Sequence, residues 1–347
     1  MNNKFDVIQV GLGPMGIIIN KLLNIRKNLN IKGVIDINPQ LIGKKLSEIL
    51  QTDVESDLII EQDLEVVLTK GKVDVVIIAT SSSLDKIIPL IKKAANSGCN
   101  IISICEELSY PFQHYPKLSE ELNVLGINNN VTILGTGINP GYLMDLLPIV
   151  VTAPCQSVKS IKVTRMMNSA KRRVPFQKKI GTGLSVEEFH RKINDKEITG
   201  HVGLTQSIQM IVAATGIKCD EIIEVPPKEI LLKEDLETSY GELIQKGYVC
   251  GLQSTAYAKE RGKDVITLDF VAYAGDHEEF DSVLIEGIPG IEQKIIGGVH
   301  GDLGTSAMVA NLIPVVVMAR PGLLTMKDIP VPRYTENIWK NEILKSK

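Results

Sequence analysis

The sequence predicts an α/β protein with two parts: a Rossmann-type doubly wound parallel sheet, and an inserted α+β domain built on a mixed or antiparallel sheet. Three observations indicate this class. The first 135 residues alternate strand-like and helix-like patterns, the second half contains long β-rich runs, and an apolar helix-like segment returns near the end. The 347 residues suffice for about two domains, each able to bury a core.

Repeated strand–helix units fill the first half of the chain. Asp74–Thr80 is a continuous apolar run, as expected for a parallel strand covered on both faces. Asn38-Pro39 offers an N-cap and a first-turn proline for a helix through Leu50. We expect strands at 5–10, 33–37, 74–80, 100–104 and 131–134, with helices at 16–25, 38–50, 83–97 and 116–125. Units of this length imply right-handed crossovers.

The second half follows a different plan. Ser185 and Glu188 have the spacing of a capping box at the start of a helix, and 204–214 reads as another helix. A charged turn at Lys259–Lys263 separates two long β-rich runs. Strands are expected at 158–167, 248–258, 265–274, 282–285 and 293–296, which predicts a sheet of adjacent hairpins.

The last helix-like segment, Asp302–Ala319, is apolar and contains Pro314. A lone terminal helix cannot form its own domain, so we expect it to cover the first sheet. The chain then crosses between domains near 141 and 301. This assigns 1–140 and 302–347 to a dinucleotide-binding domain, and 141–301 to a substrate-binding and oligomerisation domain.

Composition excludes several classes. Lys and Arg total 38 against 41 Asp and Glu, so the net charge of −3 argues against a nucleic-acid partner. No apolar run approaches the roughly 18–20 residues of a membrane span, and the N-terminus lacks a signal-peptide core, so we expect a cytoplasmic protein without a membrane partner. The five cysteines form no Cys-x-x-Cys pair and the histidines no metal-binding spacing, so we assign no metal.

The turn Gly11-Leu12-Gly13-Pro14-Met15-Gly16 directly follows a strand and opens a helix. Gly11 permits the tight turn, Gly13 leaves room for a pyrophosphate, and Gly16 allows close packing of helix on strand, while the helix N-terminus offers N–H groups to the phosphates. Asp36 ends the second strand, where its carboxylate can accept from ribose hydroxyls. The context predicts a Rossmann-type site for NAD. NADP stays possible, since Lys44 and Lys45 could reach a phosphate.

Ligands of such sheets bind beyond the carboxyl ends of the strands. Three loops there carry polar groups: Thr80-Ser81-Ser82, the acid pair Glu106-Glu107, and the glycine-rich 135–141 with Tyr142 and Asp145 after it. Each loop is also compatible with ordinary turn chemistry, but their convergence favours a site. The expected cofactor-binding residues are Gly11, Gly13, Pro14, Met15, Gly16, Asp36, Thr80, Ser81, Ser82, Gly137 and Asn139.

A basic segment lies in the second half. It contains Arg165, the run Lys171-Arg172-Arg173 and the pair Lys178-Lys179, and it continues into Gly181-Thr182-Gly183. A solvated charged loop is the plainer interpretation. The alternative is an anion site, because we expect the glycine turn to lead into a helix N-terminus whose N–H groups suit a carboxylate. The expected substrate-binding residues are Asp145, Arg165, Lys178, Lys179, Gly181 and Thr182.

Acidic loops in one domain and a basic segment in the other favour an amino acid that carries a further amine. Amine oxidation needs a neutral nitrogen before hydride leaves, so a base must take a proton. We expect Glu106 or Glu107 to bind the reacting amine or accept its proton. The alternative for this pair is an acid cluster at a helix start. Asp145 and His201 are weaker candidates.

Several longer stretches carry a resemblance to a known family. They are G-L-G-P-M-G, C-E-E-L-S-Y-P (105–111), G-T-G-I-N-P-G-Y-L-M-D (135–145), A-K-R-R-V-P-F-Q-K-K-I-G-T-G (170–183), G-H-V-G-L (200–204) and H-G-D-L-G-T-S-A (300–307). In these, nearly the whole chain resembles the 2,4-diaminopentanoate dehydrogenase family. The resemblance implies oxidative deamination at C4 to 2-amino-4-oxopentanoate and ammonium in ornithine degradation, with NAD or NADP, by a cytosolic homo-oligomer, expected to be a dimer.

The expected fold is also similar to that of dihydrodipicolinate reductase. That family carries a histidine pair and a K-x-x-x-P-S-G-T stretch, where this chain has Met166-Met167 and K-K-I-G-T-G. The similarity transfers anion binding to Lys178, Lys179, Gly181 and Thr182. Two alternatives stay open: a reductase of a cyclic imine, and a non-catalytic NAD-binding sensor.

Overall fold

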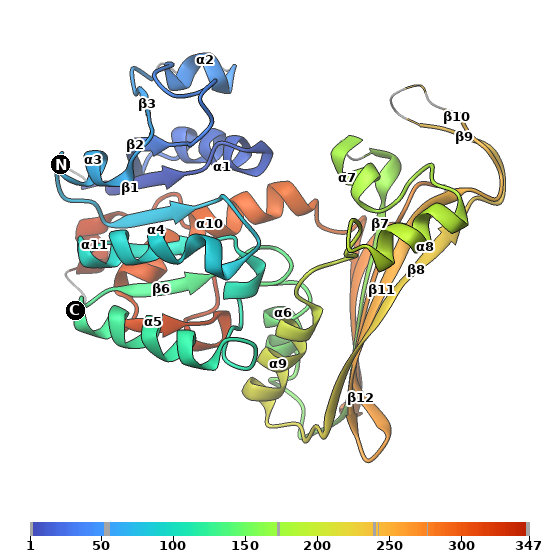
Figure 1. The fold of residues 1–347 in the computed structure, drawn as a ribbon. Helices are drawn as coiled ribbons and strands as arrows, with labels where there is room; N and C mark the ends of the chain where they lie inside the picture. Colours follow the sequence, from blue (N-terminus) through green and yellow to red (C-terminus); the bar gives the residue numbers. More distant parts are fainter. Residues whose placement is uncertain are drawn as a thin grey trace. The chain divides into compact units, whose positions relative to one another are not determined.

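The computed structural model describes residues 3–51, 56–171, 174–238, 241, 243–275 and 277–344. The chain divides into two compact units (Figure 1). Unit 1 contains residues 1–142 and 300–347, and unit 2 contains 143–299. The second unit is therefore inserted into the first.

Unit 1 is built on a seven-stranded sheet in the order β15-β6-β5-β4-β1-β2-β3, whose pairings are parallel. The strands are β1 (Phe5–Val10), β2 (Leu29–Ile35), β3 (Ile60–Glu61), β4 (Val75–Ile78), β5 (Asn100–Ser103), β6 (Thr132–Gly135) and β15 (Gly322–Leu324). The order runs outward from β1 in both directions, which confirms the doubly wound parallel sheet. All four residues of β4 are fully buried, as the apolar run predicts.

The helices of unit 1 are α1 (Pro14–Ile25), α2 (Leu46–Leu50), α3 (Leu64–Leu68), α4 (Leu84–Asn96), α5 (Pro116–Asn128), α10 (Gly301–Met318) and α11 (Lys340–Leu344). The helix expected over 38–50 is wrong for its first two turns. The Asn38 side chain accepts a hydrogen bond from the Gln40 N–H (3.0 Å), and Gly43 has a φ of +80°. Asn38 therefore closes a local turn instead of capping a helix, which starts only at Leu46.

The terminal helix α10 packs against α1, β4, β5 and β6, as expected for a segment that returns to the first sheet. Contrary to the sequence expectation, its 18 residues are long and apolar enough to cross a membrane, the one such helix in the described ranges. Of that stretch, 44% is buried inside the protein, since the helix lies in the core of unit 1. Sequence analysis missed the short β15 that follows it.

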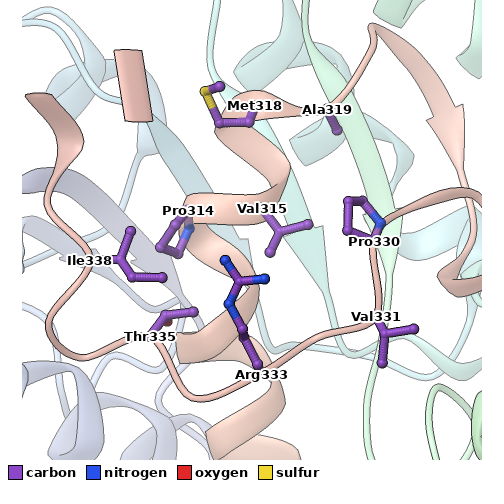
Figure 2. Close-up of a pocket in the computed structure, with 9 residues that line it drawn as sticks. All are labelled: Pro314, Val315, Met318, Ala319, Pro330, Val331, Arg333, Thr335 and Ile338. Carbon is purple, nitrogen blue, oxygen red and sulfur yellow. The ribbon is translucent and has the colours of Figure 1, made fainter. Parts of the chain in front are cut away.

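A groove of about 200 Å³ lies on unit 1 beside the end of α10 (Figure 2). Its walls come from α10 and its C-cap and from the segment 330–338, with the lining residues Pro314, Val315, Met318, Ala319, Pro330, Val331, Arg333, Thr335 and Ile338. Thr335 anchors that segment, because its N–H donates to the Asn311 side chain (3.3 Å).

Unit 2 contains a six-stranded sheet in the order β14-β13-β7-β12-β11-β8, in which β7 and β12 are parallel and the other neighbours antiparallel. This confirms the mixed sheet. The strands are β7 (Ser157–Asn168), β8 (Glu221–Leu231), β11 (Val249–Glu260), β12 (Lys263–Tyr273), β13 (Phe280–Ile288) and β14 (Ile291–Ile296), and a separate pair joins β9 (Leu236–Glu237) to β10 (Leu243–Ile244). The helices are α6 (Leu146–Val151), α7 (Val174–Lys179), α8 (Val186–Asn194) and α9 (Leu204–Thr215).

Two details of this sheet differ from expectation. The hairpin turn between β11 and β12 is shorter than 259–263, since Lys259, Glu260 and Lys263 belong to the strands. Sequence analysis also missed β8, which contains Pro226-Pro227. Proline cannot donate to a sheet ladder, and β8 tolerates both because it is an edge strand with a register shift at that point.

Candidate active site

The glycine turn after β1 has the geometry expected of a phosphate-binding turn. Gly11 has a φ of +99°, and a Cβ there would lie 2.4 Å from the Ala79 carbonyl oxygen. A Cβ on Gly16 would lie 2.1 Å from the Gly11 carbonyl oxygen, whereas nothing lies within 4 Å of one on Gly13. Because α1 starts at Pro14, its first-turn N–H groups lack acceptors within the helix. The space at Gly13 and these N–H groups fit a dinucleotide pyrophosphate.

A buried side chain that sequence analysis missed supports this turn. The Gln9 amide nitrogen donates to the Gly11 carbonyl (2.9 Å) and to the Gly16 carbonyl (2.7 Å). The Asn20 amide donates in turn to the Gln9 side-chain oxygen (2.9 Å). A polar residue inside the apolar strand Phe5–Val10 was the available signal. Gln9 fixes the first and last glycine of the motif relative to each other.

Asp36 lies at the end of β2, as predicted. One carboxylate oxygen accepts from the Leu12 N–H (2.6 Å), and the other from the Asn38 N–H (2.8 Å). Each oxygen keeps a further lone pair for a ribose hydroxyl. Lys45, a candidate for binding the extra phosphate of NADP, forms an ion pair with Asp57 at 3.3 Å.

The loops after β1, β4, β5 and β6 meet at one edge of the sheet. The Thr80 methyl lies 2.9 Å from the position of a Cβ on Gly11, and the Ser82 carbonyl accepts from the Cys105 thiol (3.0 Å). The Thr136 N–H donates to the Ser103 carbonyl (2.8 Å). The convergence expected of these loops is thus present within unit 1.

Two features of these loops bear on ligand binding. The Thr136 hydroxyl is buried and has no hydrogen-bond partner among the described residues, so its bonding capacity is unused. Ser81 accepts from the Ser83 N–H (3.1 Å), which shapes its own loop. Gly137 and Asn139 belong to a compact turn, where a Cβ on Gly137 would lie 2.9 Å from the Pro140 carbonyl oxygen.

The acid pair after β5 divides into two different environments. One Glu107 carboxylate oxygen accepts from the Leu84 N–H (2.7 Å) and from the Tyr115 hydroxyl (2.9 Å). The half-buried Glu106 carboxylate forms no hydrogen bond or ion pair with the residues that the structure describes. Burial raises the pKa of the neighbouring Cys105 to about 12, so this thiol stays protonated. Glu106 is therefore the available carboxylate at this strand end.

In unit 2, Asp145 also has a structural role. It is fully buried, and it caps α6 by accepting from the Leu146 N–H (2.6 Å). Its other oxygen accepts from the Ser207 hydroxyl of α9 (3.0 Å). The carboxylate thus joins two helices, and its contact with a substrate ammonium group stays a prediction.

The turn Gly181-Thr182-Gly183 also differs from expectation. It follows the C-terminus of α7, and its three N–H groups donate to the carbonyls of Lys178, Gln177 and Val249. The expectation of free N–H groups at a helix N-terminus is wrong, because this turn satisfies carbonyls that α7 leaves open at its end. The next helix begins only at Val186, capped by the Ser185 side chain. Arg172 and Arg173 lie outside the described residues.

A charged row crosses the sheet of unit 2. Arg165 of β7 lies opposite Phe270 of β12 and Asp281 of β13, and its guanidinium is 3.8 Å from the Asp281 carboxylate and 2.7 Å from the Val299 carbonyl oxygen. The His201 ring stacks on Phe270 at 4.3 Å between centroids, and the backbone N–H of His201 donates to the Ser254 hydroxyl (3.1 Å).

The charges that act on the His201 ring are positive. Burial, followed by the charges of Arg165 and Lys179, lowers the pKa of His201 to about 3, so the imidazole is neutral at physiological pH. The charges of Arg165 and Lys179 therefore both act on His201, although Lys179, like Lys178, is exposed to solvent on α7. The expectation that these side chains bind a substrate carboxylate stays a prediction. No group of three or more His, Cys, Asp or Glu among the described residues could hold a metal ion.

Comparisons with known proteins agree with this arrangement. The family model for the 2,4-diaminopentanoate dehydrogenase C-terminal domain matches residues 142–345. A curated 2,4-diaminopentanoate dehydrogenase of Acetoanaerobium sticklandii is 35% identical over 339 residues, covering 95% of this chain and 94% of that protein.

Solved structures share the fold. An amine dehydrogenase from Mycobacterium smegmatis superposes with a TM-score of 0.81 at 21% identity, covering 96% of this chain and 98% of that one. Dihydrodipicolinate reductase from Paenisporosarcina sp. TG-14 gives a TM-score of 0.53 at 15% identity, covering 96% and 99%. The expected similarity to that reductase fold is confirmed.

Proposed function

The chain belongs to the 2,4-diaminopentanoate dehydrogenase family, and from that premise we propose how its residues carry out the reaction. The activity is the NAD(P)-dependent oxidative deamination of 2,4-diaminopentanoate at C4. Hydride leaves C4, an imine forms, and water hydrolyses it to 2-amino-4-oxopentanoate and ammonium, with net release of one proton. The observation that carries the proposal is full-length similarity to the relative combined with the phosphate-binding geometry at Gly11–Gly16.

The cofactor site lies in unit 1. When bound, the nicotinamide ring is the hydride acceptor of the reaction. The N–H groups at the start of α1 would hold the pyrophosphate above Gly13, and Asp36 would accept from the ribose hydroxyls. We propose NAD as the preferred cofactor, because a 2′-phosphate would meet the Asp36 carboxylate.

Glu106 would take the proton of the reacting ammonium group. Its carboxylate is half-buried and free of partners among the described residues, whereas that of Glu107 bonds to Leu84 and Tyr115. A neutral amine is needed for hydride departure, and the same carboxylate can then direct water to the imine.

The substrate carboxylate would bind in unit 2. Arg165 and Lys179 set a positive potential around the His201 ring, and a neutral imidazole adds a hydrogen-bonding group without repelling an ammonium. This arrangement suits an amino acid better than a simple amine.

One experiment tests the proposal directly. The purified chain is incubated with 2,4-diaminopentanoate and NAD or NADP, and formation of the reduced cofactor is followed. We expect turnover with the diamino acid, faster with NAD, and a loss of about 100-fold or more in Glu106→Gln. Dihydrodipicolinate with NADH should give no turnover. Cofactor binding without turnover of any diamino acid would favour a sensor instead.

We further propose a cytoplasmic homodimer that acts in ornithine degradation. One alternate set of β7 side chains is buried, including Ile161 and Val163, while Lys162 and Thr164 between them are more exposed. A sheet with such a less covered face can pair with a second copy. Sedimentation equilibrium should give twice the monomer mass, and a monomer at assay concentrations would contradict it.

A further inference from the structure

We propose that Glu107 and Tyr115 form a latch that holds the acid turn, Glu106–Leu108, against the cofactor loop, Thr80–Ser83. Glu107 is then a positioning residue that fixes Glu106 and exchanges no proton with the substrate. This inference deepens the proposed function and rests on it.

The first half of the latch is a cap for α4 that comes from the acid turn after β5. Leu84 is the first residue of α4, and its N–H donates to the Glu107 carboxylate at 2.7 Å. Ser83 occupies the N-cap position, but its side chain accepts no capping bond. Glu107 therefore replaces the local cap, and its charge lies at the positive end of the 13-residue helix.

The second half of the latch is a phenol. Tyr115 directly precedes α5, and its hydroxyl donates to the same Glu107 oxygen at 2.9 Å. Burial, followed by the Glu107 carboxylate, raises the pKa of Tyr115 to about 12, so the hydroxyl remains a donor throughout the working range of pH. One oxygen of Glu107 thus joins the beginnings of α4 and α5.

Backbone contacts tie the same two segments. The Ser82 carbonyl accepts from the Glu107 N–H (3.4 Å) and from the Cys105 thiol (3.0 Å). The loop with the expected cofactor-binding residues and the turn that carries the acid pair are therefore joined by backbone contacts as well.

The short helix Glu106–Leu108 separates the roles of the two acids. It is a 3-10 turn, in which successive side chains point about 120° apart. With Glu107 directed at Leu84 and Tyr115, Glu106 is directed elsewhere and keeps its carboxylate unbonded among the described residues. A proton on the bonded Glu107 oxygen would displace one of the two donors, so the latch is incompatible with proton shuttling at that atom.

The test compares three changes at these positions in the full-length protein. Glu107→Gln keeps an oxygen that can accept both bonds, so we expect kcat within about threefold of the parent, whereas Glu106→Gln should lose about 100-fold or more. Glu107→Ala removes the latch and should lower kcat about tenfold and raise the KM for the cofactor, with the shape of the pH profile retained. Tyr115→Phe should show a smaller change of the same kind.

Glu121→Gln, an exposed acid on α5, is the matched control and should leave all parameters unchanged. A loss in Glu107→Gln as large as that in Glu106→Gln would overturn the latch, as would parental kcat and KM in Glu107→Ala. If Glu107→Ala does not fold, Glu107→Gln and Tyr115→Phe still test the latch.

Amide hydrogen exchange separates this inference from the proposed function. If the parent protein turns over no diamino acid, the proposed function fails, while the latch still predicts faster exchange of the Leu84 N–H in Tyr115→Phe than in the parent. Unchanged exchange there would overturn the latch whatever the substrate.

Discussion

The turns at 11–13 and 181–183 share the pattern Gly-x-Gly but differ in their relation to a helix. The first precedes α1, so the helix N–H groups beside it have no acceptors within the helix. The second follows α7, and its N–H groups are consumed by carbonyls of Lys178, Gln177 and Val249. The turn at the start of a helix thus keeps donors for an anion, whereas the turn at the end of a helix loses its donors to nearby carbonyls.

The largest effect is expected at Gly11. Gly11→Ala places a Cβ 2.4 Å from the Ala79 carbonyl oxygen at a φ of +99°. Strain and overpacking together should lower the free energy of unfolding by about 3 kcal/mol and abolish measurable NAD binding. Chemical denaturation and cofactor titration measure both. Parental binding in a folded variant would show that the first turn does not contact the cofactor.

Gly181→Ala should destabilise the protein without affecting the cofactor. The new Cβ would lie 2.6 Å from the Phe189 ring at a φ of +80°. We expect a loss of about 2 kcal/mol in the free energy of unfolding, and an unchanged Kd for NAD. Denaturation and fluorescence titration of the same sample provide the two numbers. A weakened Kd would mean that the second turn also serves the nucleotide.

Gly13→Ala should weaken cofactor binding without destabilising the protein, which is the reverse of Gly181→Ala. Nothing lies within 4 Å of the added Cβ, and Gly13 has an extended backbone with φ −63° and ψ −179°. Stability should therefore be unchanged, while the methyl group intrudes on the pyrophosphate and weakens NAD binding about tenfold, or about 1.4 kcal/mol. Equal NAD affinity in the parent and the variant would contradict the placement of the phosphates.

The smallest effect is expected from Lys179 of the basic segment, whose positive charge acts on His201. His201 has its pKa lowered from 6.5 to about 3, so between these values the unfolded chain binds a proton that the folded one does not. Stability therefore falls as pH falls through this window, by up to about 1.4 kcal/mol per pH unit. Lys179→Gln removes one cause of the shift and should make the total decline across this window slightly smaller.

Denaturation midpoints of the Lys179→Gln variant and the parent at pH values between 6.5 and 3 measure that difference. His201→Gln is the reference in which the contribution of the imidazole is absent. If Lys179→Gln matches the parent while His201→Gln differs from it, Lys179 exerts no charge effect on this ring.

Local patterns predicted much of unit 1. The apolar run at Val75–Ile78 and the turn from Gly11 to Gly16 are determined by neighbouring residues, so their structure follows from the sequence alone. Asn38-Pro39 misled the helix prediction because the Asn38 side chain can cap a turn as well as a helix. The prolines of β8 concealed a strand whose edge position is set by the rest of the sheet.

The sequence by itself determined the parallel sheet, the nucleotide turn and the carboxylate of Asp36, since backbone conformation and hydrophobic period act over a few residues. Only the tertiary structure decided between Glu106 and Glu107, because the Leu84 N–H and the Tyr115 hydroxyl come from other segments. The same holds for Gly183, whose N–H bonds to Val249 far along the chain. Whether a distant segment already bonds to a polar group is determined by folding alone, and this decides how much of the group's bonding capacity is left for a ligand.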